Sequence, residues 1–146
     1  MAGDWAGTVR DELTADVRRV VERLRTLSPA QLAAPAPPHP SRAAGGRAVA
    51  QALATAAQGI EDRVSPGEPH WRTLPELADL AVGDQVAVTG HDLLALLLAT
   101  TFPGDHAVVG VVVAPEETVW APGARRTAED VVTDAAAQLA ALRRAL

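Results

Sequence analysis

Apolar residues recur at intervals of three and four in three segments of this 146-residue chain, a spacing typical of amphipathic helices. The segments predict helices over residues 9–27, 41–61 and 127–144. Each begins at or beside a hydroxyl that can accept a bond from a free N–H of the first turn: Thr8, Ser41 and Thr127. Since each helix has one apolar face, the three need a common core to bury those faces.

A further helix is expected in the middle of the chain. Residues 73–76 read TLPE and have the form of a capping box, and the helix would run from there to about residue 100. It is apolar nearly all round, which predicts a buried central helix rather than one at the surface.

Two β-prone runs follow that helix, at residues 107–114 and 118–121, with residues 115–117 between them. This arrangement predicts a small hairpin between the third and fourth helices. The fold class that follows is mainly α. We expect a single domain over residues 1–146, built as a four-helix bundle with a small β-hairpin between helices 3 and 4.

Composition excludes several classes of function. Cysteine is absent, which removes disulfides, thiolate metal sites and cysteine nucleophiles. The net charge of −5 lacks the basic balance of duplex-binding proteins, so we expect no nucleic-acid partner. No apolar run approaches the ~20 residues that cross a bilayer, and the first residues do not resemble a secretory signal. We therefore expect a cytoplasmic protein without a membrane partner.

The third predicted helix carries polar residues at helical spacing. Projection at about 100° per residue places Asp84 and His91 on one side of the helix, flanked by Gln85 and Asp92. Because this helix is expected to be buried, these groups need partners. The opposite side carries a strip of small residues, Gly83, Ala87 and Gly90, which would let a neighbouring helix approach closely.

The second helix offers partners for these polar groups in Gln51, Thr55 and Gln58, which form a polar line along it. One interpretation is a structural network buried between the helices. The other is a small-molecule pocket between the second and third helices, because bundle sites are built from facing helices. Its ligand-binding residues would be Gln51, Thr55, Gln58, Gln85 and Asp92. His91 is expected to face the interior and to bond Gln51 or Gln58.

Residues 27–35 read LSPAQLAAP and residues 89–93 read TGHDL. These phrases resemble the DinB-type four-helix bundle, and in particular the actinobacterial group related to mycothiol-dependent maleylpyruvate isomerase. The resemblance implies a divalent-metal site, formed in active members by a His on the second helix and an acid and a His on the third. Matching the Asp-Leu pair puts Gln51, Gln85 and Thr89 at those positions. None suits a transition metal, so we expect the family's fold and pocket but no metal and no cofactor.

Three functions are open at this point. The first is a metal-independent protein that binds a small-molecule ligand in the polar pocket. The second is a thiol-dependent transferase or isomerase, with His91 as general base and Asp84 or Asp92 to orient it. The third is a non-catalytic structural homodimer that associates through the strip of small residues and the hairpin. We expect a homodimer because an exposed β-prone edge and a core of small side chains both favour association.

Overall fold

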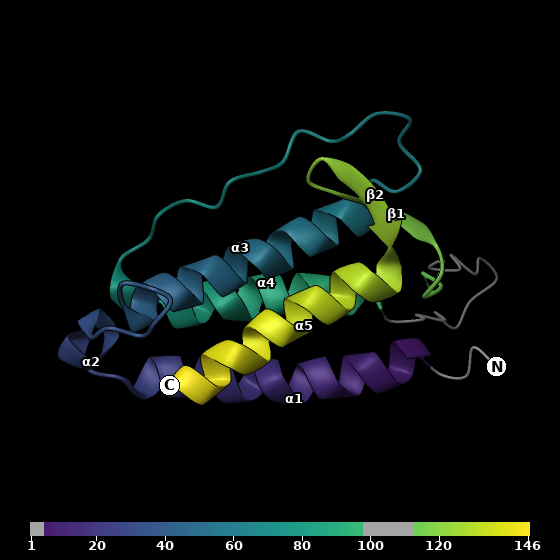
Figure 1. Ribbon diagram of the computed structural model, residues 1–146. Helices are drawn as coiled ribbons and strands as arrows, with labels where there is room; N and C mark the ends of the chain where they lie inside the picture. The colour runs from purple at the N-terminus through teal and green to yellow at the C-terminus, as the bar shows by residue number, and fades with distance from the viewer. Residues whose placement is uncertain (1–4, 98–112) are drawn as a thin grey trace, which may run out of the picture.

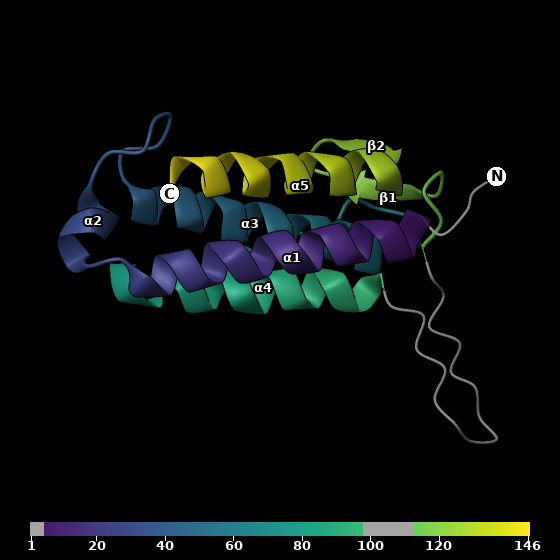
Figure 2. The same cartoon turned by 90° about the horizontal axis from the view of Figure 1, so that it is seen from below.

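A computed structural model of the protein describes residues 5–97 and 113–146. Within them the fold is mainly helical, with four long helices that lie side by side (Figure 1; Figure 2). These are α1 (Trp5–Thr26), α3 (Arg42–Glu61), α4 (Val82–Leu96) and α5 (Ala128–Ala145). None of the described helices is long and apolar enough to cross a membrane.

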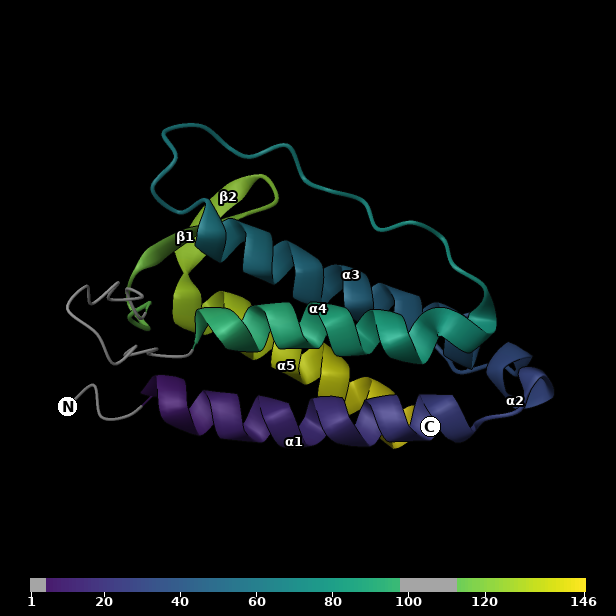
Figure 3. The same cartoon turned by 180° about the vertical axis from the view of Figure 1, so that it is seen from behind.

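Helices α3 and α4 are consecutive long helices of the chain, yet they run in the same direction (Figure 3). The chain returns from the end of α3 to the end where α3 began, passing along its outer side (Figure 1). We call residues 62–78 of this return the strap. A single 3-10 turn, η1 (Asp79–Ala81), joins the strap to α4. Because the strap passes over two neighbouring helices, it can cover polar groups on both.

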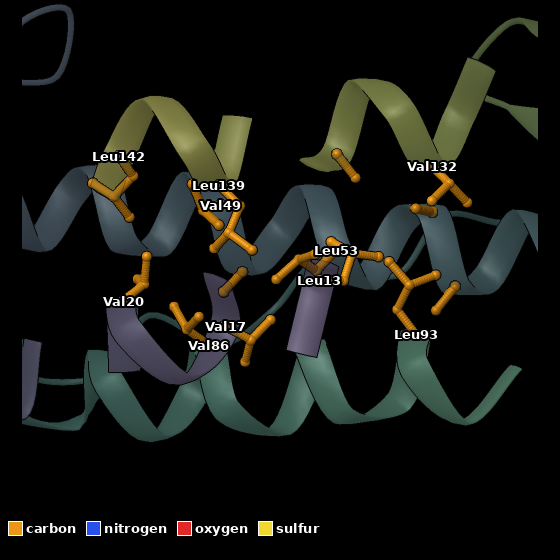
Figure 4. Close-up of a cluster of buried hydrophobic side chains, with 14 of the residues drawn as sticks. Leu13, Val17, Val20, Val49, Leu53, Val86, Leu93, Val132, Leu139 and Leu142 are labelled. Carbon is orange, nitrogen blue, oxygen red and sulfur yellow. The ribbon is translucent and has the colours of Figure 1, made fainter. Parts of the chain in front are cut away.

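Aliphatic side chains from the four long helices point toward one another and form the core (Figure 4). Leu13 and Val20 come from α1, Val49 and Leu53 from α3, and Leu139 from α5. All five are buried, which confirms the apolar faces predicted for the first, second and last helices. Fully burying a valine or leucine side chain contributes roughly 1.5–3 kcal/mol to the stability of the fold.

Side-chain caps fix where α3 and α5 begin. The N–H of Ala44 donates to Ser41 Oγ (3.0 Å), and the N–H of Asp130 donates to Thr127 Oγ1 (3.2 Å). Both caps are those predicted from the sequence. The cap predicted at Thr8 is wrong, because α1 begins earlier and Thr8 lies inside it.

Helix α4 begins later than the sequence predicts, since residues 73–76 form no capping box and no helix. The N–H of Leu74 donates instead to Gln51 Oε1 on α3 (2.9 Å). In the first turn of a helix this N–H would have no partner within the helix. Its bond to the side chain of Gln51 therefore stabilises an extended backbone at this position. The continuation expected toward residue 100 lies in part outside the described residues, which stop at residue 97 before the gap.

Glycines let α4 lie close against α1. A Cβ atom at Gly90 would lie 2.9 Å from both methyl carbons of Val17, and one at Gly83 would lie 3.0 Å from Arg25 Cγ. The close helix approach predicted for this strip is therefore confirmed, with α1 as the neighbour. Because α1 of the same chain covers this strip, the strip is not free in this structure for the homodimer contact expected there.

A two-stranded antiparallel hairpin comes directly before α5, as predicted, but one of its strands differs. The predicted second run forms β1 (Thr118–Ala121), and it pairs with β2 (Ala124–Thr127). Residues Pro122 and Gly123 form the turn, and Gly123 has a φ of 77°, a conformation that glycine adopts without strain. The first predicted strand lies largely outside the described residues, which resume at residue 113.

Candidate ligand site

Two glutamine side chains of α3 hold the strap against the helix. Gln58 Nε2 donates to the carbonyl of His70 (2.8 Å), and the N–H of Arg72 donates to Gln58 Oε1 (3.0 Å). Gln51 repeats the pattern, since its Nε2 donates to the carbonyl of Arg72 (3.0 Å) and its Oε1 accepts from Leu74 (2.9 Å). Each amide therefore pairs with a donor and an acceptor of an extended backbone, as a neighbouring strand would.

Two further residues extend this anchoring along the strap. Gln85 of α4 is only 8% exposed, and its Nε2 donates to the carbonyl of Pro75 (3.0 Å). Arg47 Nη2 donates to the carbonyl of Leu77 (2.8 Å) and to Asp79 Oδ1 (2.5 Å). Between α3 and α4, the amide groups expected to bind a ligand are thus engaged by the protein's own backbone.

The remaining candidates on α4 face solvent. His91, Asp84 and Asp92 are exposed, and Val88 on the same side of the helix is 60% exposed. Asp84 accepts a bond from Arg25 Nε of α1 (2.9 Å) instead of orienting His91. The burial predicted for His91 is wrong, and so is its bond to a glutamine of α3. The reason is that α4 packs against α1 and α3, and this third side turns away from both.

The strap divides the predicted pocket between α3 and α4 into two cavities. Gln58 and Asp92 line one of about 220 Å³. Gln51 and Gln85 line another of about 310 Å³, nearer the beginning of both helices. Leu74 of the strap belongs to the wall of both cavities. The five predicted binding residues therefore do not converge on one ligand position.

A third cavity, of about 350 Å³, lies where α3 meets α5 and the hairpin. Its polar wall combines Gln51 and Thr55 of α3 with Arg126 of β2 and with Asp134 and Gln138 of α5. Much of its apolar wall consists of alanines, namely Ala48, Ala52, Ala56, Ala121 and Ala135. Apolar walls with a few polar groups of this kind are typical of small-molecule sites.

A charged pair stands in the wall of this third cavity. Arg126 Nη1 donates to Asp134 Oδ2 (2.6 Å), and the two side chains are 39% and 57% exposed. This hydrogen bond is the main cause that raises the pKa of Arg126, and the charges of Asp134 and Asp130 act in the same direction against the effect of burial. Within the described residues the bond engages one nitrogen and one oxygen, so further guanidinium N–H groups and Asp134 Oδ1 can bond a ligand.

The outer face of the hairpin is tied to the strap. Trp120 Nε1 donates to the carbonyl of Ser65 (3.2 Å). The guanidinium carbon of Arg125, the cross-strand partner of Trp120, lies 3.9 Å from the centre of the Trp120 ring. A cation over an indole face is attracted by the electrons of the ring. These contacts hold the hairpin, and with it the wall of the third cavity, against the rest of the fold.

Glu68 of the strap makes a second tie to the hairpin. Its Oε1 accepts from the N–H of Gly123 (2.6 Å) and from the indole N–H of Trp71 (2.9 Å). The bond from Gly123, and after it the bond from Trp71, lower the pKa of the Glu68 carboxyl group, because both favour its charged form. The carboxylate therefore holds the hairpin turn to the strap at neutral pH.

No group of three or more potential metal ligands among His, Asp and Glu gathers within the part of the chain that the structure describes. At the positions matched to the metal ligands of the resembled family, Thr89 Oγ1 donates to the carbonyl of Gln85 (2.9 Å). The amides of Gln85 and Gln51 bond the strap. The absence of a metal and of a cofactor stays a prediction.

Sequence reasoning found Gln51 and Thr55 of the third cavity but missed its other polar residues. Asp134 and Gln138 lie four residues apart on the last predicted helix, so their shared face could have been noticed. Arg126 gave no comparable indication, because β2 was not expected as a strand.

No family model, no curated protein and no solved structure that was compared with the chain matches it. Function is therefore inferred from the geometry of the chain itself.

Proposed function

We propose that this protein binds a small organic molecule, without a metal ion, in the cavity between α3, α5 and the hairpin. The proposal is carried by the third cavity, of about 350 Å³. Its wall combines alanines with the Arg126–Asp134 pair and with neutral polar groups. Sites for small molecules have this size and this mixture of walls. The predicted binding residues Gln51 and Thr55 belong to this cavity.

The wall of the cavity favours a ligand with an apolar body and a polar edge. Alanine side chains offer apolar surface and leave room, and Thr55 and Gln138 can each donate and accept. Arg126 and Asp134 largely neutralise each other's charge. Electrostatic complementarity therefore favours a neutral or zwitterionic ligand over one with a large net charge.

The proposal includes the DinB-like four-helix bundle and a cytoplasmic location. Four long helices around one core support the bundle, and α3 and α4 run parallel through a long connection, as bundles with a crossover do (Figure 3). The resemblance adds the expectation that a bundle of this type carries its site between long helices.

No observation favours the two alternatives over binding. A transferase or isomerase with His91 as general base would need an oriented partner, and the side chain of His91 is exposed and has no hydrogen bond to any described residue. Asp84 bonds Arg25 instead. A homodimer stays a prediction, and the mass of the protein in solution at micromolar concentration would check it.

A fragment screen by protein-observed NMR tests the proposal. We expect neutral, partly aromatic fragments to shift the backbone amide signals of Thr55, Asp134 and Ala135, which line the cavity on its two helical sides. The substitution Ala52→Phe would fill the cavity from α3, so it should abolish these shifts.

Two control variants separate a specific site from a general effect. Ala137→Phe adds the same ring at an exposed position of α5 and should leave binding unchanged. His91→Ala should also leave it unchanged, since this residue is exposed on α4. The proposal is refuted if no fragment shifts the cavity signals, or if Ala52→Phe and the parent protein bind alike.

A further inference from the structure

We propose that the ligand of the third cavity is a zwitterion whose carboxylate and ammonium groups are joined through one carbon atom, as in a free α-amino acid with an apolar side chain. This inference rests on the function proposed above and names the chemical class of the ligand. Arg126 and Asp134 are the only charged side chains among the described residues that line the cavity. They form one positive and one negative charge in direct contact, since Arg126 Nη1 and Asp134 Oδ2 lie 2.6 Å apart.

Both members of this pair are accessible to a molecule in the cavity. Arg126 comes from β2 and Asp134 from α5, and their side chains are 39% and 57% exposed. An ion pair this exposed stabilises a fold only a little, because water screens the two charges. The two side chains can therefore adjust to a ligand without a large loss of stability.

Each member of the pair can hold a second partner while the pair stays in contact. The bond between them involves one terminal nitrogen of Arg126, and a guanidinium has five N–H donors in a fixed fork. It involves one of the two carboxylate oxygens of Asp134. A ligand carboxylate can thus bond Arg126 while a ligand ammonium group bonds Asp134, and both bonds are of the strong, charge-assisted kind.

The contact between the two charges determines how far apart the charges of the ligand should be. When a zwitterion with adjacent charges lies antiparallel to the pair, each of the four charges touches two of opposite sign. A ligand with a single charge would bond one member of the pair but lie beside the like charge of the other. A flexible zwitterion with distant charges would have to fold back on itself, which costs conformational entropy.

The rest of the cavity suits the remaining parts of an apolar α-amino acid. Ala48 and Ala52 of α3 and Ala135 of α5 offer apolar surface to its side chain. A volume of about 350 Å³ is many times the ~30 Å³ that one water molecule takes up, so a chain of several carbons has room. Thr55 and Gln138, which also line the cavity, can donate further bonds to the carboxylate.

Norleucine and ε-aminocaproate form a matched pair of probes. They are isomers that carry the same two charges at pH 7 and differ only in the separation of these charges. In NMR titrations at pH 7, we expect norleucine to shift the backbone amide signals of Thr55, Asp134 and Ala135. Its dissociation constant should be of the order of 1 mM, as for other ligands this small. We expect ε-aminocaproate to bind at least tenfold more weakly.

Two variants test the roles of the two charges. Asp134→Asn should weaken norleucine binding at least tenfold but strengthen the binding of hexanoate, because Arg126 then meets a carboxylate without a competing negative charge beside it. Arg126→Gln should also weaken norleucine binding but strengthen the binding of pentylamine, which lacks the carboxylate. Opposite responses to the two singly charged probes cannot result from a general loss of structure.

Asp84→Asn is the matched control for Asp134→Asn. Asp84 also pairs with an arginine at an exposed position, since it bonds Arg25, but it does not line the cavity. The control variant should bind norleucine within about twofold of the parent protein, which is the usual effect of a distant substitution.

Three results would overturn the proposal: equal binding of the two isomers, no norleucine-induced shift of the cavity signals, and unchanged norleucine binding in Asp134→Asn. Failure of this proposal is distinguishable from failure of the proposed function. If neutral fragments shift the cavity signals and norleucine does not, the cavity binds small molecules but the zwitterion is wrong. If neither binds there, both proposals fail.

Discussion

Gly59 of α3 lies where the hairpin touches the helix, and the substitution Gly59→Ala should unseat that contact. A Cβ atom at this position would overlap the carbonyl oxygen of Trp120 and would lie 3.0 Å from its carbonyl carbon. Ordinary contacts begin at 3.4 Å, so the backbone of β1 must retreat by about 0.4 Å for the carbon alone, and by more for the oxygen. A backbone carbonyl cannot evade the methyl group by changing rotamer.

The expected cost is the difference between two opposing terms. Overpacking a close contact costs typically 1–3 kcal/mol, and a backbone obstacle belongs at the upper end, about 3 kcal/mol. Alanine is a better helix former than glycine by about 1 kcal/mol, which offsets part of this. We therefore expect Gly59→Ala to lower the free energy of unfolding by about 2 kcal/mol. The retreat of Trp120 should also weaken its bond to the carbonyl of Ser65, which is already 3.2 Å long.

Urea denaturation followed by circular dichroism measures this cost. With a slope of about 2 kcal/mol/M, the midpoint should fall by about 1 M. Gly67→Ala is the matched control, because a Cβ at Gly67 of the strap would meet nothing within 4 Å. Its midpoint should stay level or rise slightly, since alanine restricts the unfolded chain. A Gly59→Ala protein as stable as the parent would show that the hairpin does not rest on this glycine.

Two further predictions concern the core and the strap. A Cβ at Gly46 would overlap Val82 Cγ1, so Gly46→Ala should destabilise the protein. The double variant with Val82→Ala should lose about 1–2 kcal/mol less unfolding free energy than the two single variants lose together. Strictly additive losses would contradict the contact. The lowered pKa of Glu68 means that its stabilising bonds are fully present above the ordinary value of 4.5 and are lost as the pH falls through the lower folded value. The indole N–H signal of Trp71 should therefore titrate with a midpoint below pH 4.5, and a midpoint at or above it would contradict the bond.

The three helices with one apolar face were predictable from the sequence, and in two of them two independent features agree. Apolar spacing locates the helix, and a hydroxyl at its beginning gives the start, as at Ser41 and Thr127. At Thr8 the hydroxyl was misleading, since α1 starts earlier. The position of the hairpin before the last helix was also predictable. Its second strand was missed because the turn at Pro122 and Gly123, the strongest local feature, was not used.

The candidate site was harder to predict because one error produced the next. Because a helix was predicted to begin at residues 73–76, no extended backbone was expected beside Gln51 and Gln58. Without that backbone, two amides that face a second helix suggest a ligand. A primary amide is complementary to the N–H and C=O of an extended peptide, and it is equally complementary to the amide of a ligand. The residue type alone cannot separate the two, since the difference lies in where the chain returns.

The cavity between α3 and α5 illustrates the converse difficulty. Ala48, Ala52 and Ala56 recur at every fourth residue of α3, a pattern that usually lets two helices approach closely. Here the same alanines line a cavity, because β1 lies against both α3 and α5 and its carbonyl at Trp120 rests on Gly59. The small side chains leave a hollow only because the hairpin shares the space between the helices. A stripe of alanines therefore predicts a close contact or a pocket according to what the neighbouring segment does.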